Sequence, residues 1–256
     1  MSIKHKFYQT NFGRGFQTNN AILDITPYKP EIIVIGTFNP NTPNDNFADF
    51  YYGRNYFWTA FANLFRHNRP VLTHTRMPRR GSPPAILNPT LPEILELCIK
   101  LKLTFADLIF EVLHNNSPSY QTLKNDNIIL NGIEFNLIQD GQKGEVGGLQ
   151  QLNAIEQVNW NTQNIIEYLS INPQIKTIYF TRQPTGIWAE QWNSIVNNER
   201  VVGRIATNLF TPSGLSLKGK PRMNALLKHW IHNNEPNFGR LDNDWLTSNG
   251  VNIQNF

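Results

Sequence analysis

The residues best suited to chemistry follow a short apolar run near the start of the chain. Ile32-Ile33-Val34-Ile35 leads directly into Gly36-Thr37-Phe38-Asn39-Pro40, and the block Tyr51-Tyr52-Gly53-Arg54-Asn55-Tyr56-Phe57-Trp58 follows soon after. Carboxamides hydrogen-bond to the edges of rings, and aromatic side chains line the pockets of flat ligands. Because ligands of open α/β sheets bind beyond the carboxyl ends of the strands, these segments predict a pocket for a planar ring.

Alternating strands and helices are expected to position these residues. Apolar runs predict strands, and apolar residues at helical spacing predict helices. The expected strands cover 31–35, 103–109, 175–181 and 202–209, and the expected helices cover 55–65, 93–101, 162–169, 187–196 and 221–231. The Gly-rich segment 9–19 predicts a surface loop or hairpin. Strands separated by helix-length segments indicate an α/β protein with a parallel sheet and helices on both faces.

The length of 256 residues, with 40% hydrophobic residues, suits one domain spanning 1–256. The polar segments near 70–92 and 115–151 are interpreted as insertions. No apolar run reaches the roughly 18 residues of a membrane span, and the first residues lack the apolar core of a signal peptide, so a soluble cytoplasmic protein is expected. The single cysteine, Cys98, excludes disulfides and thiolate metal clusters. Apart from His229 and His232, for which phosphate contact or solvation is favoured over zinc, the histidines lack metal-binding spacing, so no metal is expected.

Positive charge is unevenly distributed along the chain. The net charge is +4 and the isoelectric point is about 9.2. The segments from Arg54 to Arg80 and from Arg200 to Lys228 each hold six basic residues and no acidic one. Such stretches are typical of surfaces that bind a phosphate backbone, although solvated surface charge is the alternative.

Several segments together resemble the uracil-DNA glycosylase superfamily. They are Gly36-Thr37-Phe38-Asn39-Pro40, the Tyr51–Trp58 block, Phe105-Ala106-Asp107-Leu108-Ile109 and Thr211-Pro212-Ser213-Gly214-Leu215-Ser216. The most similar branches are the DNA-deoxyinosine and mismatch-specific glycosylases. The resemblance implies a three-layer α/β/α fold with a central four-stranded parallel sheet. It also implies an enzyme that flips a base out of DNA and hydrolyses its N-glycosidic bond.

Two asparagines compete for the role of positioning the attacking water. Asn39 lies in the first-strand loop, where the mismatch-specific branch carries its catalytic asparagine, but one residue further from Gly36 than in that pattern. Asn55 matches the Arg-Asn-x-Phe-Trp block of the deoxyinosine branch. The structural alternatives are a turn residue for Asn39 and a helix N-cap for Asn55.

Base and DNA contacts are implied by the same resemblance. The candidates for stacking on the flipped base are Phe38, Tyr51 and Tyr52, whereas Asp107 either holds a pocket water or simply ends its strand. The late loop would grip phosphates through backbone amides and a hydroxyl, with Leu215 either inserting as a wedge or packing at a helix start. The residues expected to contact DNA are Arg54, Thr211, Pro212, Ser213, Gly214, Leu215, Lys218, Lys220 and Arg222.

No lysine lies in the first-strand loop or the tyrosine block, so the expected chemistry is monofunctional, leaves an abasic site and needs no cofactor. DNA is the expected partner of a monomeric protein. The excised base is either a deaminated one, uracil or hypoxanthine, in DNA repair, or a hypermodified cytosine of phage DNA in antiviral defence. A DNA-binding protein of the same fold without catalysis is the alternative function.

Overall fold

The computed structural model describes residues 2–42, 46–73, 89–113, 138, 148–213, 222–233 and 235–256. Most of the two expected insertions, 70–92 and 115–151, lies outside these ranges. Within the described ranges, no helix is long and apolar enough to cross a membrane.

The main sheet has seven strands in the order β10-β9-β5-β6-β4-β3-β2. Their bounds are β2 (Asn11–Gly13), β3 (Phe16–Asn19), β4 (Ile22–Ile25), β5 (Ile32–Gly36), β6 (Leu103–Asp107), β9 (Thr177–Phe180) and β10 (Ile205–Asn208). The neighbours β10, β9, β5 and β6 pair in parallel, and β4, β3 and β2 continue the sheet antiparallel. The sheet is therefore larger than the expected four strands, because the hairpin region and β4 join its edge.

A second, three-stranded antiparallel sheet, which was not expected, contains β1 (Ser2–Lys4), β7 (Ile109–Leu113) and β8 (Val158–Trp160). The chain passes from β6 into β7 through one residue, Leu108, whose N–H donates to the carbonyl of Gly36 at 3.0 Å. The expected strand over 103–109 is thus divided between two sheets. As a result, the start of the chain lies beside the carboxyl end of β6.

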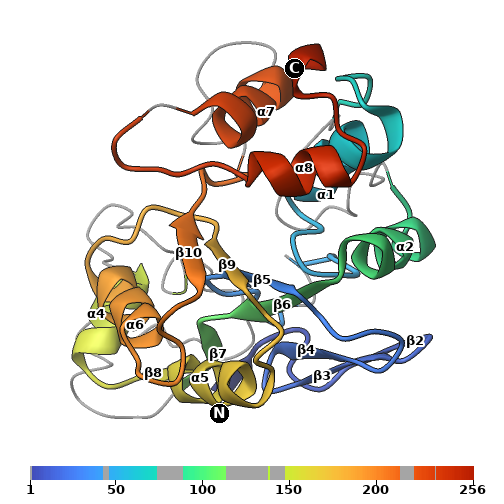
Figure 1. Ribbon diagram of the computed structural model, residues 1–256. Helices are drawn as coiled ribbons and strands as arrows, with labels where there is room; N and C mark the ends of the chain where they lie inside the picture. Colours follow the sequence, from blue (N-terminus) through green and yellow to red (C-terminus); the bar gives the residue numbers. More distant parts are fainter. Residues whose placement is uncertain are drawn as a thin grey trace.

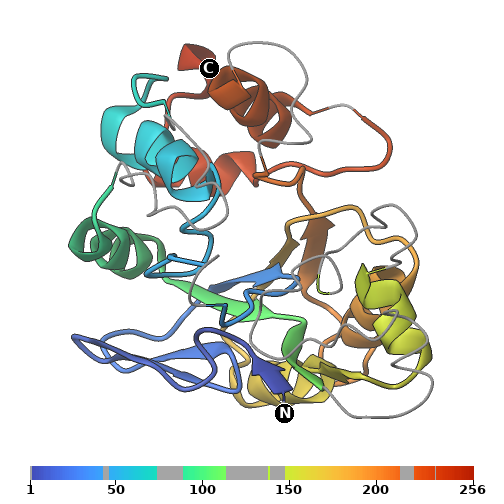
Figure 2. The same ribbon diagram turned by 180° about the vertical axis from the view of Figure 1, so that it is seen from behind.

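Helices cover both faces of the main sheet (Figures 1 and 2). Alternation along β5 directs Ile32 and Val34 to one apolar cluster and Ile33 and Ile35 to the other. The first cluster includes residues of α1 (Phe57–Ala62), α2 (Leu91–Leu101), α7 (Arg222–His232) and α8 (Asn243–Ser248). The second includes residues of α4 (Gly148–Ala154), α5 (Thr162–Ile171) and α6 (Ile187–Val196). The arrangement is a sheet between two helical layers.

Local sequence explains where the helices near the site begin and end. A capping box formed by Thr90 and Glu93 starts α2, with Pro92 in its first turn, and Lys102 ends it in the left-handed conformation. The expected helix over 55–65 starts two residues later, as α1, and continues into a π-helical turn, η1 (Asn63–His67). Near the end of the chain, η3 (Ile253–Asn255) is a short 3₁₀ helix.

Candidate active site

Three neighbouring parallel strands end at the same level of the main sheet. Gly36 at the end of β5 is in register with Asp107 at the end of β6, and the N–H of Thr181, just beyond β9, donates to the carbonyl of Ile35 at 3.1 Å. The side chains of His5, Tyr51 and Tyr52 lie around these strand ends. We call the group His5, Gly36, Tyr51, Tyr52, Asp107 and Thr181 the strand-end cluster.

Asp107 is hydrogen-bonded to a histidine from the first residues of the chain. His5 Nε2 lies 2.7 Å from Asp107 Oδ2, and the two side chains are 0% and 7% exposed. The pairing of β1 with β7 places His5 there, since its backbone N–H donates to the carbonyl of Phe110. Asp107 thus ends β6 with its carboxylate hydrogen-bonded to a buried histidine, and its role in a pocket stays a prediction.

The missing side chain of Gly36 makes room for two polar groups. A Cβ atom at this position would overlap Asp107 Oδ1 and lie 2.9 Å from the hydroxyl oxygen of Tyr52. The Tyr52 hydroxyl is also 3.0 Å from Thr181 Oγ1, and its ring stacks on Phe57 with centroids 4.5 Å apart. Burial, followed by the charge of Asp107, raises the pKa of Tyr52 well above its usual range. The hydroxyl is thus held protonated beside the carboxylate.

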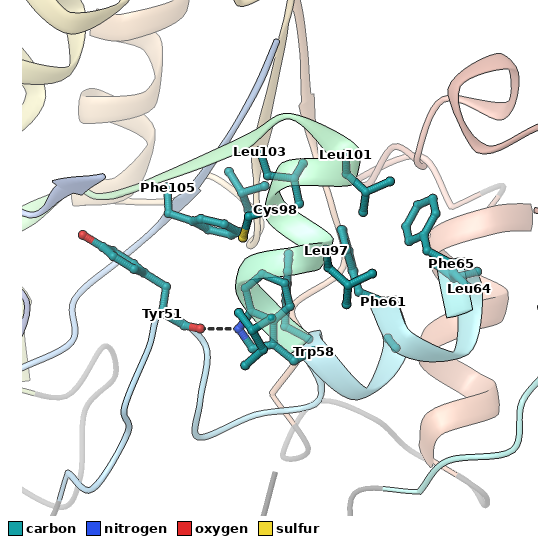
Figure 3. Packing of buried hydrophobic residues seen from close by; sticks show 14 of the residues in the cluster. Tyr51, Trp58, Phe61, Leu64, Phe65, Leu97, Cys98, Leu101, Leu103 and Phe105 are labelled. Atoms are coloured by element: carbon teal, nitrogen blue, oxygen red, sulfur yellow. Dashed lines mark hydrogen bonds between the residues drawn. The ribbon is translucent and has the colours of Figure 1, made fainter. Parts of the chain in front are cut away.

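Tyr51 is held by the core, yet its hydroxyl has no partner within the described structure. Figure 3 shows its ring beside Phe105 and its hydroxyl pointing away from Trp58, whose indole N–H donates to the carbonyl of Tyr51 at 2.5 Å. His5 and Phe7 contact the same ring. These contacts enclose the Tyr51 ring within the core. The stacking roles expected for Tyr51 and Tyr52 remain predictions.

Asn39 is oriented by a neighbouring asparagine. Asn46 Nδ2 donates to Asn39 Oδ1 and, at 2.7 Å, to the carbonyl of Pro40, while Asn46 Oδ1 accepts from the N–H of Ala48. These bonds fix which end of each carboxamide is oxygen. The Asn39 oxygen keeps one lone pair for a further donor, such as a water molecule.

Asn55 supports the chain just before α1. Its Oδ1 accepts a hydrogen bond from the N–H of Phe57 at 3.0 Å. The residue at the N-cap itself is Tyr56, so the expected cap is displaced by one position, although Asn55 still satisfies a free N–H of the first turn. One lone pair of its oxygen is occupied by this structural role.

Phe38, like Tyr52, is less enclosed than Tyr51. It is half-buried and packs against the second apolar cluster, with its ring centroid 6.2 Å from that of His5. Its stacking role stays a prediction, and its position borders the strand-end cluster.

The late loop joins the tyrosine block directly. The N–H of Tyr56 donates to the carbonyl of Pro212 at 3.1 Å, and the N–H of Ser213 bonds to Thr211 Oγ1 at 3.3 Å. Phe210 anchors the loop by stacking on His229 of α7, with centroids 4.1 Å apart. The other expected DNA contacts, Gly214, Leu215, Lys218 and Lys220, lie outside the described residues.

In the structure, the basic residues of the two stretches do not all have the same kind of surroundings. The Arg204 guanidinium donates to the carbonyls of Leu169, Ile175, Arg200 and Val201, at the opposite ends of β9 and β10 from the strand-end cluster. Arg204 is therefore a structural residue rather than part of a surface beside the late loop. Arg66 pairs with Glu93 at 2.7 Å, so the first stretch is not free of acidic neighbours. Arg222 is exposed at the start of α7, and Arg54 is half-buried.

Sequence reasoning missed His5, Lys6, Asn46 and Thr181. Lys6 lies beside the first-strand loop, since its N–H donates to the carbonyl of Asn39 and its Nζ to that of Asn46. Burial is the main cause that lowers the pKa of Lys6. A signal for His5 was present: Ile3, His5 and Phe7 alternate with lysines, which places His5 on the inward face. Within the described residues, no three His, Cys, Asp or Glu side chains are grouped to bind a metal.

No family model matches the chain, and no curated protein matches it. A similar solved structure is the solution NMR structure of a "putative Uracil DNA glycosylase" from Methanosarcina acetivorans, with 15% identity over 77% of this chain and 86% of that chain, and a TM-score of 0.33. A TM-score of this size does not establish a common fold, so the functional argument depends on the geometry of the site.

Proposed function

We propose that this protein is a DNA glycosylase of the uracil-DNA glycosylase superfamily, which flips a base out of DNA and hydrolyses its N-glycosidic bond. The observation that carries the proposal is the hydrogen bond from Tyr56 to Pro212. It joins the loop expected to grip phosphates to the segment that supplies Tyr51 and Tyr52 to the strand-end cluster. A backbone grip next to buried polar groups suits the extraction of a base from a duplex.

The proposed reaction requires different roles from different side chains of the site. Cleavage of the N-glycosidic bond builds positive charge on the sugar and negative charge on the leaving base, so it requires an oriented water and hydrogen bonds to the base. Asn39 and Asn55 are proposed to position the water. Phe38 would contact the face of the base, and Asp107 its edge. The reaction needs no cofactor and leaves an abasic site.

One assay tests the proposal. Duplexes that contain uracil, hypoxanthine or glucosylated hydroxymethylcytosine are incubated with the protein, and released base and alkali-sensitive abasic sites are measured. Release of uracil or hypoxanthine indicates repair of deaminated bases, whereas release of the glucosylated cytosine indicates defence against phage DNA. The absence of release from every duplex contradicts the proposal.

A second candidate function is DNA binding without catalysis. It is favoured by the hydrogen bonds that already engage both candidate oxygens, Asn39 Oδ1 by Asn46 and Asn55 Oδ1 by Phe57. Such a protein would bind DNA with an affinity that falls as salt rises, because phosphate contacts dominate, yet would release no base. Measuring binding and base release on the same duplexes separates the two functions.

A further inference from the structure

Both ring nitrogens of His5 are engaged in hydrogen bonds. The N–H of Phe7 donates to His5 Nδ1 at 3.0 Å, so this nitrogen is the acceptor and carries no proton. The proton of the neutral ring is then on Nε2, which donates to Asp107 Oδ2 at 2.7 Å. The imidazole is held by its backbone neighbour in the one tautomer that can donate to Asp107.

This arrangement occupies only one oxygen of Asp107. Its second oxygen, Oδ1, accepts no hydrogen bond from any described residue and lies over the bare backbone of Gly36. A buried carboxylate that uses one oxygen for positioning keeps its other oxygen as a fixed acceptor. That acceptor is level with the carboxyl ends of β5 and β6.

A hydroxyl without a partner lies in the same cluster. The Tyr51 hydroxyl is buried and has no hydrogen-bond partner among the described residues, and its ring is fixed by Phe105 and His5. Burial, followed by the charge of Asp107, raises its pKa well above the usual range, which keeps the proton on the oxygen. A buried donor without an acceptor is unfavourable, so a ligand that supplies an acceptor would be stabilised there.

We infer that His5 is a positioning residue that fixes Asp107 as an acceptor, so that Asp107 Oδ1 and the Tyr51 hydroxyl together read the edge of the excised base. The edge that fits carries an N–H donor next to an acceptor atom. This inference rests on the proposed function and adds to it the residues that select the base. It assigns Tyr51 a hydrogen-bonding role in place of a stacking one.

A ring-edge methyl group provides the test. The duplex whose base the wild-type protein releases is compared with one in which the same base is methylated at its edge N–H. Because a site built to hydrogen-bond a donor rejects an analogue that lacks it, the ratio of kcat/KM between the two should be on the order of 10² or more. His5→Leu and Tyr51→Phe should each lower this ratio by about tenfold, whereas His5→Gln, which retains a donor, should preserve most of it.

Two controls distinguish a loss of base selectivity from a loss of protein stability. His67→Leu removes an exposed histidine and should leave the ratio unchanged. Tyr51→Phe removes a hydroxyl that no described residue pairs with, so the melting temperature of this variant should not fall. An equal loss of activity on both duplexes in His5→Leu and Tyr51→Phe, with the ratio intact, would overturn the inference.

An independent readout needs no activity. The ¹⁵N shifts of His5 at pH 7 should show a protonated Nε2 and an unprotonated Nδ1, and a protonated Nδ1 would overturn the inference. If the wild-type protein releases no base from any duplex, the proposed function fails and the reading role with it, while these shifts still decide whether His5 holds Asp107.

Discussion

The N–H of Tyr56 and the carbonyl of Pro212 are joined by a 3.1 Å hydrogen bond, which connects two loops that are far apart in the sequence. Tyr56 directly precedes α1, and Pro212 lies between Thr211 and Ser213 in the loop that follows β10. Movement of the late loop on DNA would therefore be transmitted to the segment that carries Tyr51 and Tyr52. Gripping of DNA and reading of a base would then be mechanically coupled.

Removal of the Thr211 hydroxyl should weaken DNA binding. Thr211 Oγ1 accepts a hydrogen bond from the N–H of Ser213. Thr211→Val removes this hydrogen bond while keeping a side chain of the same shape. We expect a loss of about 1 kcal/mol in binding, or roughly fivefold in Kd, measured by fluorescence anisotropy on duplex DNA. Thr247→Val on α8 is the matched control, and an equal effect of both variants would argue against a role for the late loop.

Gly36→Ala should damage the strand-end cluster through overlap. The added methyl group would meet Asp107 Oδ1 and the Tyr52 hydroxyl, and such overpacking costs about 1–3 kcal/mol of the free energy of unfolding. Denaturant unfolding measures the loss. In an Asp107→Ala background the carboxylate that the methyl group would overlap is absent, so Gly36→Ala should cost less free energy of unfolding. An unchanged cost would show that the overlap is with another group.

The two candidate asparagines should differ in which property they affect. Asn39→Ala is expected to lower kcat by about 10²-fold through loss of water positioning. Asn55→Ala should also lower kcat but, in addition, destabilise the protein by about 1 kcal/mol, since it removes the acceptor of the Phe57 N–H. Single-turnover base release and thermal unfolding give both values. Asn193→Ala, at an exposed position of α6, serves as control, and full activity in both site variants would discard the assignment.

The start of α2 should make stability depend on acidic pH. Hydrogen bonds from Thr90, followed by that from Arg66, lower the pKa of Glu93 from 4.5 to about 2. A lowered folded-state pKa stabilises the protein above the unfolded value, so this contribution should be present at pH 7 and disappear as pH falls from about 4.5 to about 2. Unfolding midpoints of the wild type and Glu93→Gln should differ at pH 7 and converge near pH 2. A constant difference across this range would refute the assignment.

Lys6 provides the critical test of monofunctional chemistry. Its Nζ donates to the carbonyl of Asn46 at 2.5 Å, which holds the amine in a hydrogen bond beside Asn39. We expect no covalent adduct with an abasic duplex in the presence of borohydride. An adduct that forms with the wild type and is absent with Lys6→Arg would instead identify a lyase step.

The sequence predicted the main elements because their signals are local. The expected helix over 187–196 matches α6, and the apolar run before Gly36 matches β5, since both depend on periodicity and breakers within the segment. The second sheet was missed because β1 and β8 have three residues each, too short for a pattern, and gain stability only by pairing with β7.

The site was predictable only in part for the same reason. Asn39, Asp107 and the tyrosine block were visible as motifs at the ends of apolar runs. For His5 the sequence indicated only an inward-facing position, because its partner Asp107 is distant in the sequence. Asn46 gave no signal, because it lies in a loop whose path has no periodicity. Arg204 was misread because its charge is visible in the sequence, whereas the four carbonyls that it binds are not.

The pairing of β1 with β7 has a practical consequence for anyone who trims this polypeptide. A shortened version that starts after Phe7 would retain every motif noticed by inspection and most of the apolar interior. It would nevertheless lose the His5 imidazole beside Asp107 and β1, the strand that positions His5. Truncation experiments at this terminus would therefore perturb the strand-end cluster rather than a dispensable tail.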